Sequence, residues 1–210
     1  QPCRYQYALM EEKRPGEYFP VYEDEKGTYI LNSRDMCTID HLKELMDAGI
    51  DCIKIEGRAK SAYYAAIVTG AYRHVIDDIY AGREIDKVWR DEVDHVSHRI
   101  YSTGFYFGQP GQYTENSRYI REWQIVAKVE SCDENGLATC SLNNKFRLGD
   151  ELEVVGPDTR PFPMVAEGLK DSDGNPVEEV RTPQMVFTMQ LPKQVPAHSL
   201  IRRSVDLSAK

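Results

Sequence analysis

The feature that most constrains the fold is a change of hydrophobic pattern near Arg121. Before it, apolar residues recur at helical spacing, with short alternating segments between the helices. After it, short apolar segments follow one another, separated by clusters of Asp, Asn, Gly and Pro that are typical of turns. This pattern predicts a small antiparallel β-barrel. Its expected strands are 124–130, 137–142, 151–155, 163–169, 185–191 and 199–203.

The barrel is expected to have a core of its own and to fold as a separate domain over 121–210. Alternate positions of the expected strands are apolar, and one face of each strand must be buried. The predicted core residues are Val126, Val129, Leu152, Val154, Val165, Val186, Phe187 and Leu191.

Upstream of Arg121 the order of elements is that of βα units. Two such units cannot close a sheet, so residues 1–100 are expected to be the last part of a TIM-like barrel, with 101–120 as a linker. The fold class is thus α/β followed by all-β. The expected strands are 28–31 and 50–56, and the expected helices are 38–49 (capped by Thr38 and Gly49), 59–80 and 83–100.

Composition excludes some classes of protein. The chain has 210 residues with 26 Lys and Arg against 34 Asp and Glu, a net charge of −8. Nucleic-acid binding by a broad basic surface is therefore disfavoured, although a small basic patch remains compatible with it. Five irregularly spaced cysteines do not form a disulfide framework, which favours a reducing, cytoplasmic location. No apolar run approaches the ~20 residues of a membrane helix.

The segment from Lys54 to Lys60 carries the clearest candidate chemistry. In the expected strand 50–56, Ile53 and Ile55 point to one side and Lys54 and Glu56 to the other. In a parallel barrel the charged side faces the lumen, and Glu56 lies at the C-terminal strand end, where such barrels place their chemistry. Arg58 and Lys60 would then surround the mouth and suit an anionic ligand. An interior salt bridge of Lys54, Glu56 and Arg58 explains the same charges, and both interpretations stay open.

Two cysteines and a tyrosine are weaker candidates. Cys3 lies beside Arg4, and Cys37 precedes a helix, but their spacing alone favours two unrelated thiols. Tyr64 adds an aromatic ring that can stack on a nucleobase or pack on its own helix. The histidines have no telling partners, and the sequence contains no nucleophile elbow, zinc-protease helix, P-loop or dinucleotide fingerprint.

Several blocks of the sequence resemble consecutive motifs of the collagenase-like peptidase family. They are QPCRYQY at 1–7, YILNSRDMC at 29–37, GIDCIKIEGRAKSAYY at 49–64, and Tyr72-Arg73 with Asp77. A looser likeness continues through YSTGF at 101–105 and through Asn144-Lys145-Phe146 with Gly149-Asp150.

The resemblance implies a longer protein, whose TIM-like barrel lies mostly upstream of Gln1. It implies a [4Fe–4S] cluster, for which Cys3 and Cys37 match two of the four ligands. Together with the position of the charged segment, it assigns Glu56, Arg58 and Lys60 as catalytic residues. Arg4, Lys54 and Tyr64 are then expected to bind a cofactor, which in this family includes prephenate. Cys3 and Cys37 should lie together, and Arg58 and Lys60 should lie close to Arg4.

The implied activity is 5-hydroxylation of the wobble uridine of tRNA, with tRNA as partner. Other relatives act in hydroxylation of ribosomal RNA or of ubiquinone precursors. A collagenase-like peptidase acting on a protein or peptide is the second reading, because no residue set resembles a protease nucleophile with its base. The third is an adaptor whose C-terminal barrel binds RNA or protein.

Overall fold

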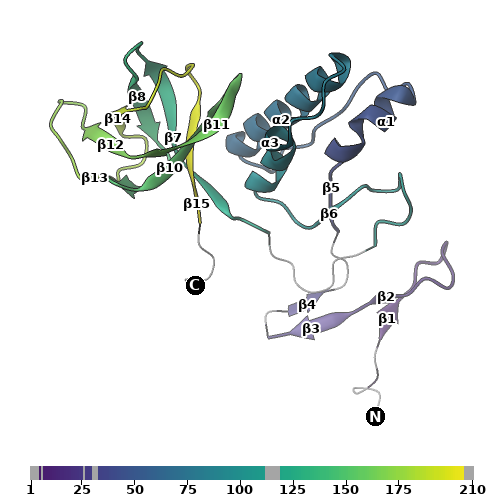
Figure 1. The fold of residues 1–210 in the computed structure, drawn as a ribbon. Helices are drawn as coiled ribbons and strands as arrows, with labels where there is room; N and C mark the ends of the chain where they lie inside the picture. The colour runs from purple at the N-terminus through teal and green to yellow at the C-terminus, as the bar shows by residue number, and fades with distance from the viewer. Residues whose placement is uncertain (1–4, 6, 26, 30–32, 112–118, 206–210) are drawn as a thin grey trace. The chain divides into compact units, whose positions relative to one another are not determined.

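The computed structural model describes residues 5, 7–25, 27–29, 33–111 and 119–205. The chain divides into two compact units, each made of two separate stretches. The first unit contains Gln1–Thr38 and His98–Ile120, and the second contains Ile39–Ser97 and Arg121–Lys210. The α-helices therefore belong to the same unit as the large sheet, and Figure 1 shows both.

The first unit consists of short paired strands. The antiparallel pairs are β1 (Ala8–Leu9) with β2 (Phe19–Pro20) and β3 (Tyr22–Asp24) with β4 (Gly27–Tyr29). A parallel pair joins β5 (Asp35–Met36) to β6 (Tyr101–Ser102). Arg99 Nη2 lies 2.9 Å from Asp35 Oδ1, so an ion pair lies at the start of this parallel pair.

The second unit begins with helices. Its longest helix, α2, is amphipathic as predicted and begins at Ser61, whose Oγ accepts a hydrogen bond from Tyr64 N at 3.2 Å. Gly49 follows α1 with φ +87°, the conformation expected after a helix C-terminus. None of the helices within the described part of the chain is long and apolar enough to cross a membrane. The helical elements are η2 (Ile39–His41), α1 (Leu42–Asp47), α2 (Ala62–Tyr80), α3 (Lys87–Asp91) and η3 (Glu92–His95).

Three predictions for this region are wrong. Residues 51–57 form no strand, because a strand needs a hydrogen-bonded neighbour and no described residue supplies one there. Thr38 does not cap α1, which begins at His41 without a side-chain cap. The helix expected at 83–100 is reduced to α3 and η3, because the Asp86 side chain caps α3 by accepting from Val88 N at 3.0 Å.

A seven-stranded sheet makes up most of the rest of the second unit, and its strands are antiparallel as predicted. The single strand expected at 163–169 is wrong, because Ala166 divides that range between two strands. Its order is β11-β10-β15-β7-β8-β14-β12, and every pairing is antiparallel. A separate two-stranded sheet pairs β9 with β13. The strands are β7 (Trp123–Cys132), β8 (Leu137–Leu142), β9 (Phe146–Arg147), β10 (Glu151–Gly156), β11 (Thr159–Val165), β12 (Glu167–Lys170), β13 (Glu179–Val180), β14 (Val186–Gln190) and β15 (Leu200–Ser204).

The sheet is strongly curled. Its two edge strands, β11 and β12, are separated in the sequence only by Ala166, so the chain passes directly from one edge to the other. Gly168 has φ +62° inside β12, beside a shift of register against β14. The chain is thus a mixed α/β part followed by a curled antiparallel sheet. The TIM-like barrel stays a prediction.

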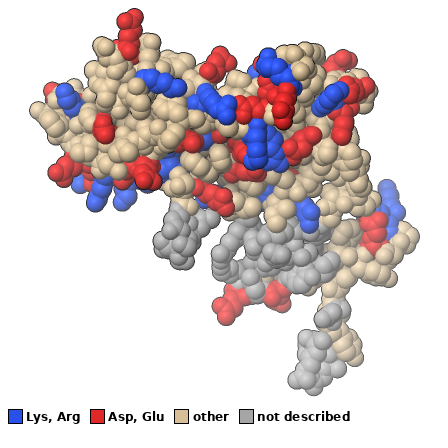
Figure 2. All heavy atoms as spheres, viewed as in Figure 1, with Lys and Arg blue, Asp and Glu red and all other residues tan. Residues whose placement is uncertain are grey.

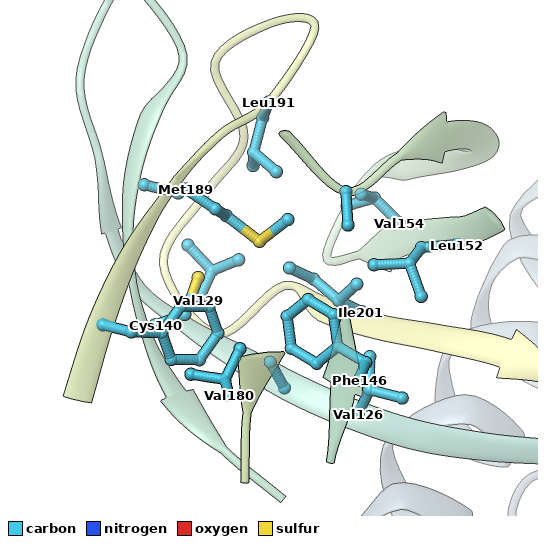
Figure 3. Close-up of a cluster of buried hydrophobic side chains, with 14 of the residues drawn as sticks. Val126, Val129, Cys140, Phe146, Leu152, Val154, Val180, Met189, Leu191 and Ile201 are labelled. Carbon is cyan, nitrogen blue, oxygen red and sulfur yellow. The ribbon is translucent and has the colours of Figure 1, made fainter. Parts of the chain in front are cut away.

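The core of the second unit lies on the concave face of the curled sheet (Figure 3). At its centre the rings of Phe146 and Phe187 meet edge to face, with centroids 5.6 Å apart. Six of the eight predicted core residues are buried. The other two, Val165 and Val186, are wrong: they are 46% and 48% exposed, because their strands turn those positions outward. The six are Val126, Val129, Leu152, Val154, Phe187 and Leu191.

Candidate functional site

The charged segment between α1 and α2 keeps the alternation predicted for it, although it is not a strand. Lys54, Glu56 and Arg58 are exposed, whereas Ile53 and Ile55 are half-buried. The two kinds of side chain therefore face different surroundings. Whether the charged side faces a barrel lumen stays a prediction.

A tight turn holds the end of this segment. Arg58 N donates to Glu56 Oε1 at 2.8 Å, and Lys60 N donates to Gly57 O at 2.9 Å. The Glu56 carboxylate thus supports the backbone of its own turn. The Arg58 side chain extends from this turn into solvent, where it can meet an anion.

Lys60 and Tyr64 lie together just after the turn. Lys60 Nζ donates to Ser97 O at 3.1 Å and lies 5.1 Å from the centroid of the Tyr64 ring. This distance is that of a cation–π contact. Both side chains therefore help to position the turn, in addition to the ligand contact predicted for them.

Cys37 follows β5 in the first unit. Its side chain is half-buried, and its backbone N–H donates to Ser102 O at 2.9 Å. Cys3 and Arg4, the other residues of the predicted cluster and anion sites, lie outside the described residues. The predicted proximity of Cys3 to Cys37, and that of Arg58 and Lys60 to Arg4, therefore stay predictions.

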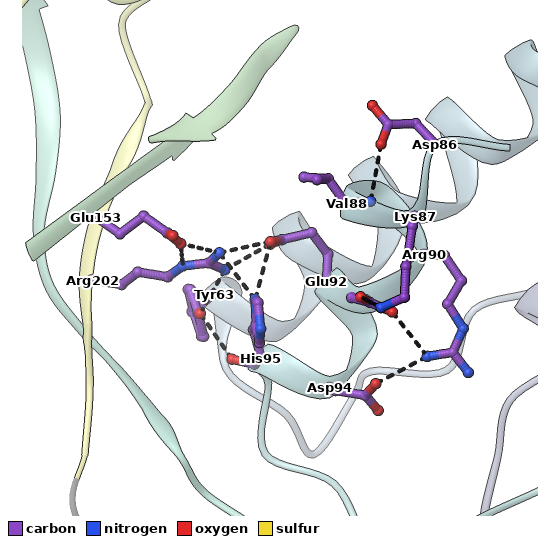
Figure 4. A network of polar contacts seen from close by, with 11 residues as sticks. Tyr63, Asp86, Lys87, Val88, Arg90, Glu92, Asp94, His95, Glu153 and Arg202 are labelled. Carbon is purple, nitrogen blue, oxygen red and sulfur yellow. Dashed lines mark hydrogen bonds and ion pairs between the residues drawn. The ribbon is translucent and has the colours of Figure 1, made fainter. Parts of the chain in front are cut away.

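A buried polar network, which the sequence pattern does not indicate, is centred on Arg202 of β15 (Figure 4). The guanidinium is fully buried and donates from Nη1 and Nη2 to the two oxygens of Glu92 at 2.6 and 2.7 Å. Its Nε donates to Glu153 Oε1 at 2.8 Å. Its other face lies 4.6 Å from the centroid of the Trp123 ring. The network thereby joins η3 to β10, β15 and β7.

Two further side chains complete the network. Tyr63 of α2 donates from its hydroxyl to His95 O at 2.9 Å, and it lies 3.3 Å from Arg202 Nη1. His95 Nδ1 lies 3.1 Å from Glu92 Oε1. Burial raises the pKa of the Tyr63 hydroxyl. Burial also raises the pKa of the Glu92 carboxyl, but hydrogen bonds with His95 and Arg202 outweigh burial and hold that pKa below its usual value.

The network is a structural ion cluster rather than a metal site. Ligand atoms of Glu92, His95 and Glu153 lie within 4.8 Å of one another, a spacing that suits a metal ion. However, the guanidinium of Arg202 already bonds both oxygens of Glu92 and Oε1 of Glu153. The expectation that the histidines have no telling partners is wrong for His95, because Glu92 lies three residues before it and its Oε1 is 3.1 Å from His95 Nδ1. The local sequence does not indicate Arg202, which lies 110 residues from Glu92.

An apolar cleft of about 580 Å³ opens beside the network within the second unit. One wall is the exposed side of α2 around Ala66 and Gly70, and the opposite wall is the turn between β10 and β11 at Pro157. His74 stacks on Trp89 at its edge, with ring centroids 3.7 Å apart. The arginine in its lining, Arg73, already pairs with Asp77, so the cleft does not resemble an anion site.

Charges on the surface are mixed. On the face drawn in Figure 2, acidic and basic side chains alternate, and the described part of that face carries no broad basic patch. This agrees with the net charge of −8. An RNA partner would therefore have to be held by a few specific contacts rather than by a general positive field.

Comparison with known sequences gives two family matches. The sequence model described as peptidase family U32 matches residues 1–116, and the model of the peptidase family U32 C-terminal domain matches residues 121–202.

Two curated relatives are named for tRNA hydroxylation. The chain is 37% identical to tRNA hydroxylation protein P of Escherichia coli K12, over 72% of this chain and 34% of that protein. It is 31% identical to tRNA hydroxylation protein P1 of Bacillus subtilis 168, over 97% of this chain and 50% of that protein. The chain thus spans between a third and a half of the length of these relatives.

One solved structure is the C-terminal domain of a putative U32 peptidase from Geobacillus thermoleovorans. It is 31% identical, and the match covers 38% of this chain and 99% of that one with a TM-score of 0.37.

Proposed function

Since the chain belongs to peptidase family U32, we propose that it is part of a protein that hydroxylates the wobble uridine of tRNA. The observation that carries this proposal is the likeness to two proteins named for tRNA hydroxylation, at 37% and 31% identity. The lengths of those relatives support a larger protein, in which this chain would complete a TIM-like barrel.

The turn at 56–60 is the proposed anion site. Arg58 is exposed, and its backbone is held by Glu56 at 2.8 Å, so the guanidinium is presented from a fixed turn. A guanidinium binds a phosphate or a carboxylate in a bidentate manner. The anion would be a tRNA phosphate or the carboxylates of a prephenate-like metabolite, with Lys54 beside it and Lys60 and Tyr64 holding the turn.

We further propose that Cys3 and Cys37 supply two of the ligands of an iron–sulfur cluster. Cys37 fits this role, because its side chain is half-buried just after a strand and a thiolate is the donor that such clusters require. The remaining ligands would come from residues beyond this chain. A bound cluster would supply electron transfer, and the residues of this chain would bind and orient the RNA.

The direct test is mass spectrometry of tRNA nucleosides from a strain that lacks the gene. The expected result is loss of 5-hydroxyuridine derivatives from the wobble position and their return when the gene is restored. Unchanged nucleosides in the deletion strain would contradict the proposed function.

A peptidase is the second candidate, because the matched family is described as a peptidase family. The test is cleavage of gelatin by the purified full-length protein. Cleavage that survives Cys3→Ala and Cys37→Ala would favour the peptidase, because proteolysis would then not depend on the proposed cluster ligands. Absence of cleavage together with loss of tRNA hydroxylation in the deletion strain would exclude it.

A further inference from the structure

The first unit exposes large apolar side chains in one turn. Phe105 is 67% exposed and Tyr106 is 53% exposed. The turn is bounded by Gly104 and Gly108, whose φ angles are +62° and +132°. Exposing adjacent aromatic rings to water is unfavourable. Contiguous exposed apolar groups on a protein commonly mark an interaction surface.

Met36 belongs to the same surface. The register of β5 and β6 pairs Met36 with Ser102, two residues before Gly104. A Cβ atom on Gly104 would lie 3.2 Å from Met36 Sδ, so the methionine side chain lies against the start of the turn. Met36 is itself 58% exposed. We call Met36, Phe105 and Tyr106 the aromatic turn surface.

One buried guanidinium nitrogen without a described acceptor, Arg34 Nε, accompanies this surface. Arg34 Nε is buried and has no hydrogen-bond partner among the residues that the structure describes. The adjacent carboxylate, Asp35, is already used by Arg99 at 2.9 Å. In extended backbone, Arg34 and Met36 project to the same side, opposite to Asp35. A buried donor that lacks an acceptor is costly, and an incoming phosphate would satisfy it.

We infer that the aromatic turn surface and Arg34 bind a single-stranded loop of RNA, with a nucleobase stacked on Phe105 or Tyr106 and a phosphate at Arg34. This inference rests on the proposed function and names where the tRNA loop would be held. Unpaired bases stack on aromatic side chains regardless of sequence. Stacking also suits a chain of net charge −8, because it provides affinity without a broad basic surface.

The surface also lies next to the proposed cluster ligand in the sequence. Cys37 follows Met36 directly, and its N–H donates to Ser102 O at 2.9 Å. A base stacked on this turn would therefore be bound by the same pair of strands that carries Cys37. This placement favours an RNA loop over a peptide, because base modification requires a base to be held near the reacting centre.

The experiment measures binding of a fluorescein-labelled anticodon stem-loop RNA to the full-length protein by anisotropy, at several salt concentrations. Phe105→Ala and Tyr106→Ala are expected to weaken binding by about 5- to 150-fold each, the range for loss of one stacked base, with the salt dependence unchanged. Arg34→Gln is expected to reduce the slope of log K against log salt by about 0.7, the value for one phosphate contact on a single strand.

The matched control is Tyr80→Ala, which removes a ring that is 77% exposed on α2 in the other unit and should leave binding unchanged. Thermal midpoints of all variants verify folding, and the two exposed aromatic positions keep the test valid if Arg34→Gln does not fold.

Three outcomes would overturn the inference. If the wild type binds the RNA and Phe105→Ala and Tyr106→Ala bind equally well, the surface is not the RNA site, and the proposed function is untouched. If the wild type does not bind the RNA, both the inference and the proposed function fail. If Phe105→Ala instead abolishes binding of a gelatin peptide, the surface serves a peptide.

Discussion

Arg202 and Arg58 represent two opposite uses of an arginine in this chain. Arg202 is fully buried, donates to Glu92 and Glu153, and connects helices to the sheet. Arg58 is exposed, and only the backbone of its turn is held. A buried charge with all its partners stabilises one arrangement of elements. An exposed charge on a fixed turn contributes little to stability and remains available to a ligand.

The largest expected effect comes from breaking the buried side of this comparison. Arg202→Met leaves the carboxylates of Glu92 and Glu153 without their cation, and should lower the free energy of unfolding by about 3–5 kcal/mol. Urea denaturation measures this free energy of unfolding. The control is Arg160→Met, an arginine that is 62% exposed and pairs with Asp86, for which the loss should be below about 1 kcal/mol. Equal losses for the two variants would mean that the network is not a stabilising element.

The next largest loss of stability is expected at Gly136, where the backbone is crowded just before β8. Gly136 has φ +83°, and a Cβ there would lie 2.4 Å from Leu191 O, so Gly136→Ala should cost about 2–4 kcal/mol. Gly149 has φ +86° but open space around it, so Gly149→Ala should cost only about 1–2 kcal/mol. Urea denaturation of both variants separates the steric cost from the conformational one. If the two losses are the same, the close approach at Gly136 relaxes freely.

The pH dependence of stability sharpens the comparison further. Burial raises the pKa of Glu92, but hydrogen bonds with His95 and Arg202 outweigh it, so the folded pKa lies below the unfolded one. The stability contributed by Glu92 is therefore present at neutral pH and is lost as pH falls below the usual glutamate value of about 4.3. Unfolding free energies between pH 7 and pH 3 should fall less steeply in Glu92→Gln than in the wild type. Parallel profiles would show that Glu92 does not titrate differently on folding.

Hydrophobic periodicity predicted the elements whose buried face follows from the local sequence. The helix α2 was found from its apolar face, and the strands β7, β8, β10, β14 and β15 from alternation between turn residues. The strand expected at 50–56 was wrong because a strand depends on a neighbour that the local sequence does not specify. Val165 and Val186 were assigned to the core because their apolar character alone does not tell which face of the strand is buried.

The candidate site was predicted only in part. The sequence predicted that Lys54 and Glu56 lie on the side opposite to Ile53 and Ile55, and the burial of these four residues alternates in that way. That the charged side faces a barrel lumen stays a prediction. The buried cluster was missed because the partners of Arg202 lie 49 to 139 residues from it in the sequence. The aromatic turn surface was overlooked because exposure of Phe105 and Tyr106 is a tertiary property.

The most direct test compares Arg58→Ala with the wild type in a strain that lacks the gene. The account predicts that Arg58→Ala in the full-length protein abolishes wobble-uridine hydroxylation, measured by nucleoside mass spectrometry, while its thermal midpoint stays near that of the wild type. Arg181→Ala, at another exposed arginine, should restore hydroxylation fully. If Arg58→Ala retains hydroxylation, or if its loss accompanies a large drop in the thermal midpoint, Arg58 is structural and the anion site is wrong.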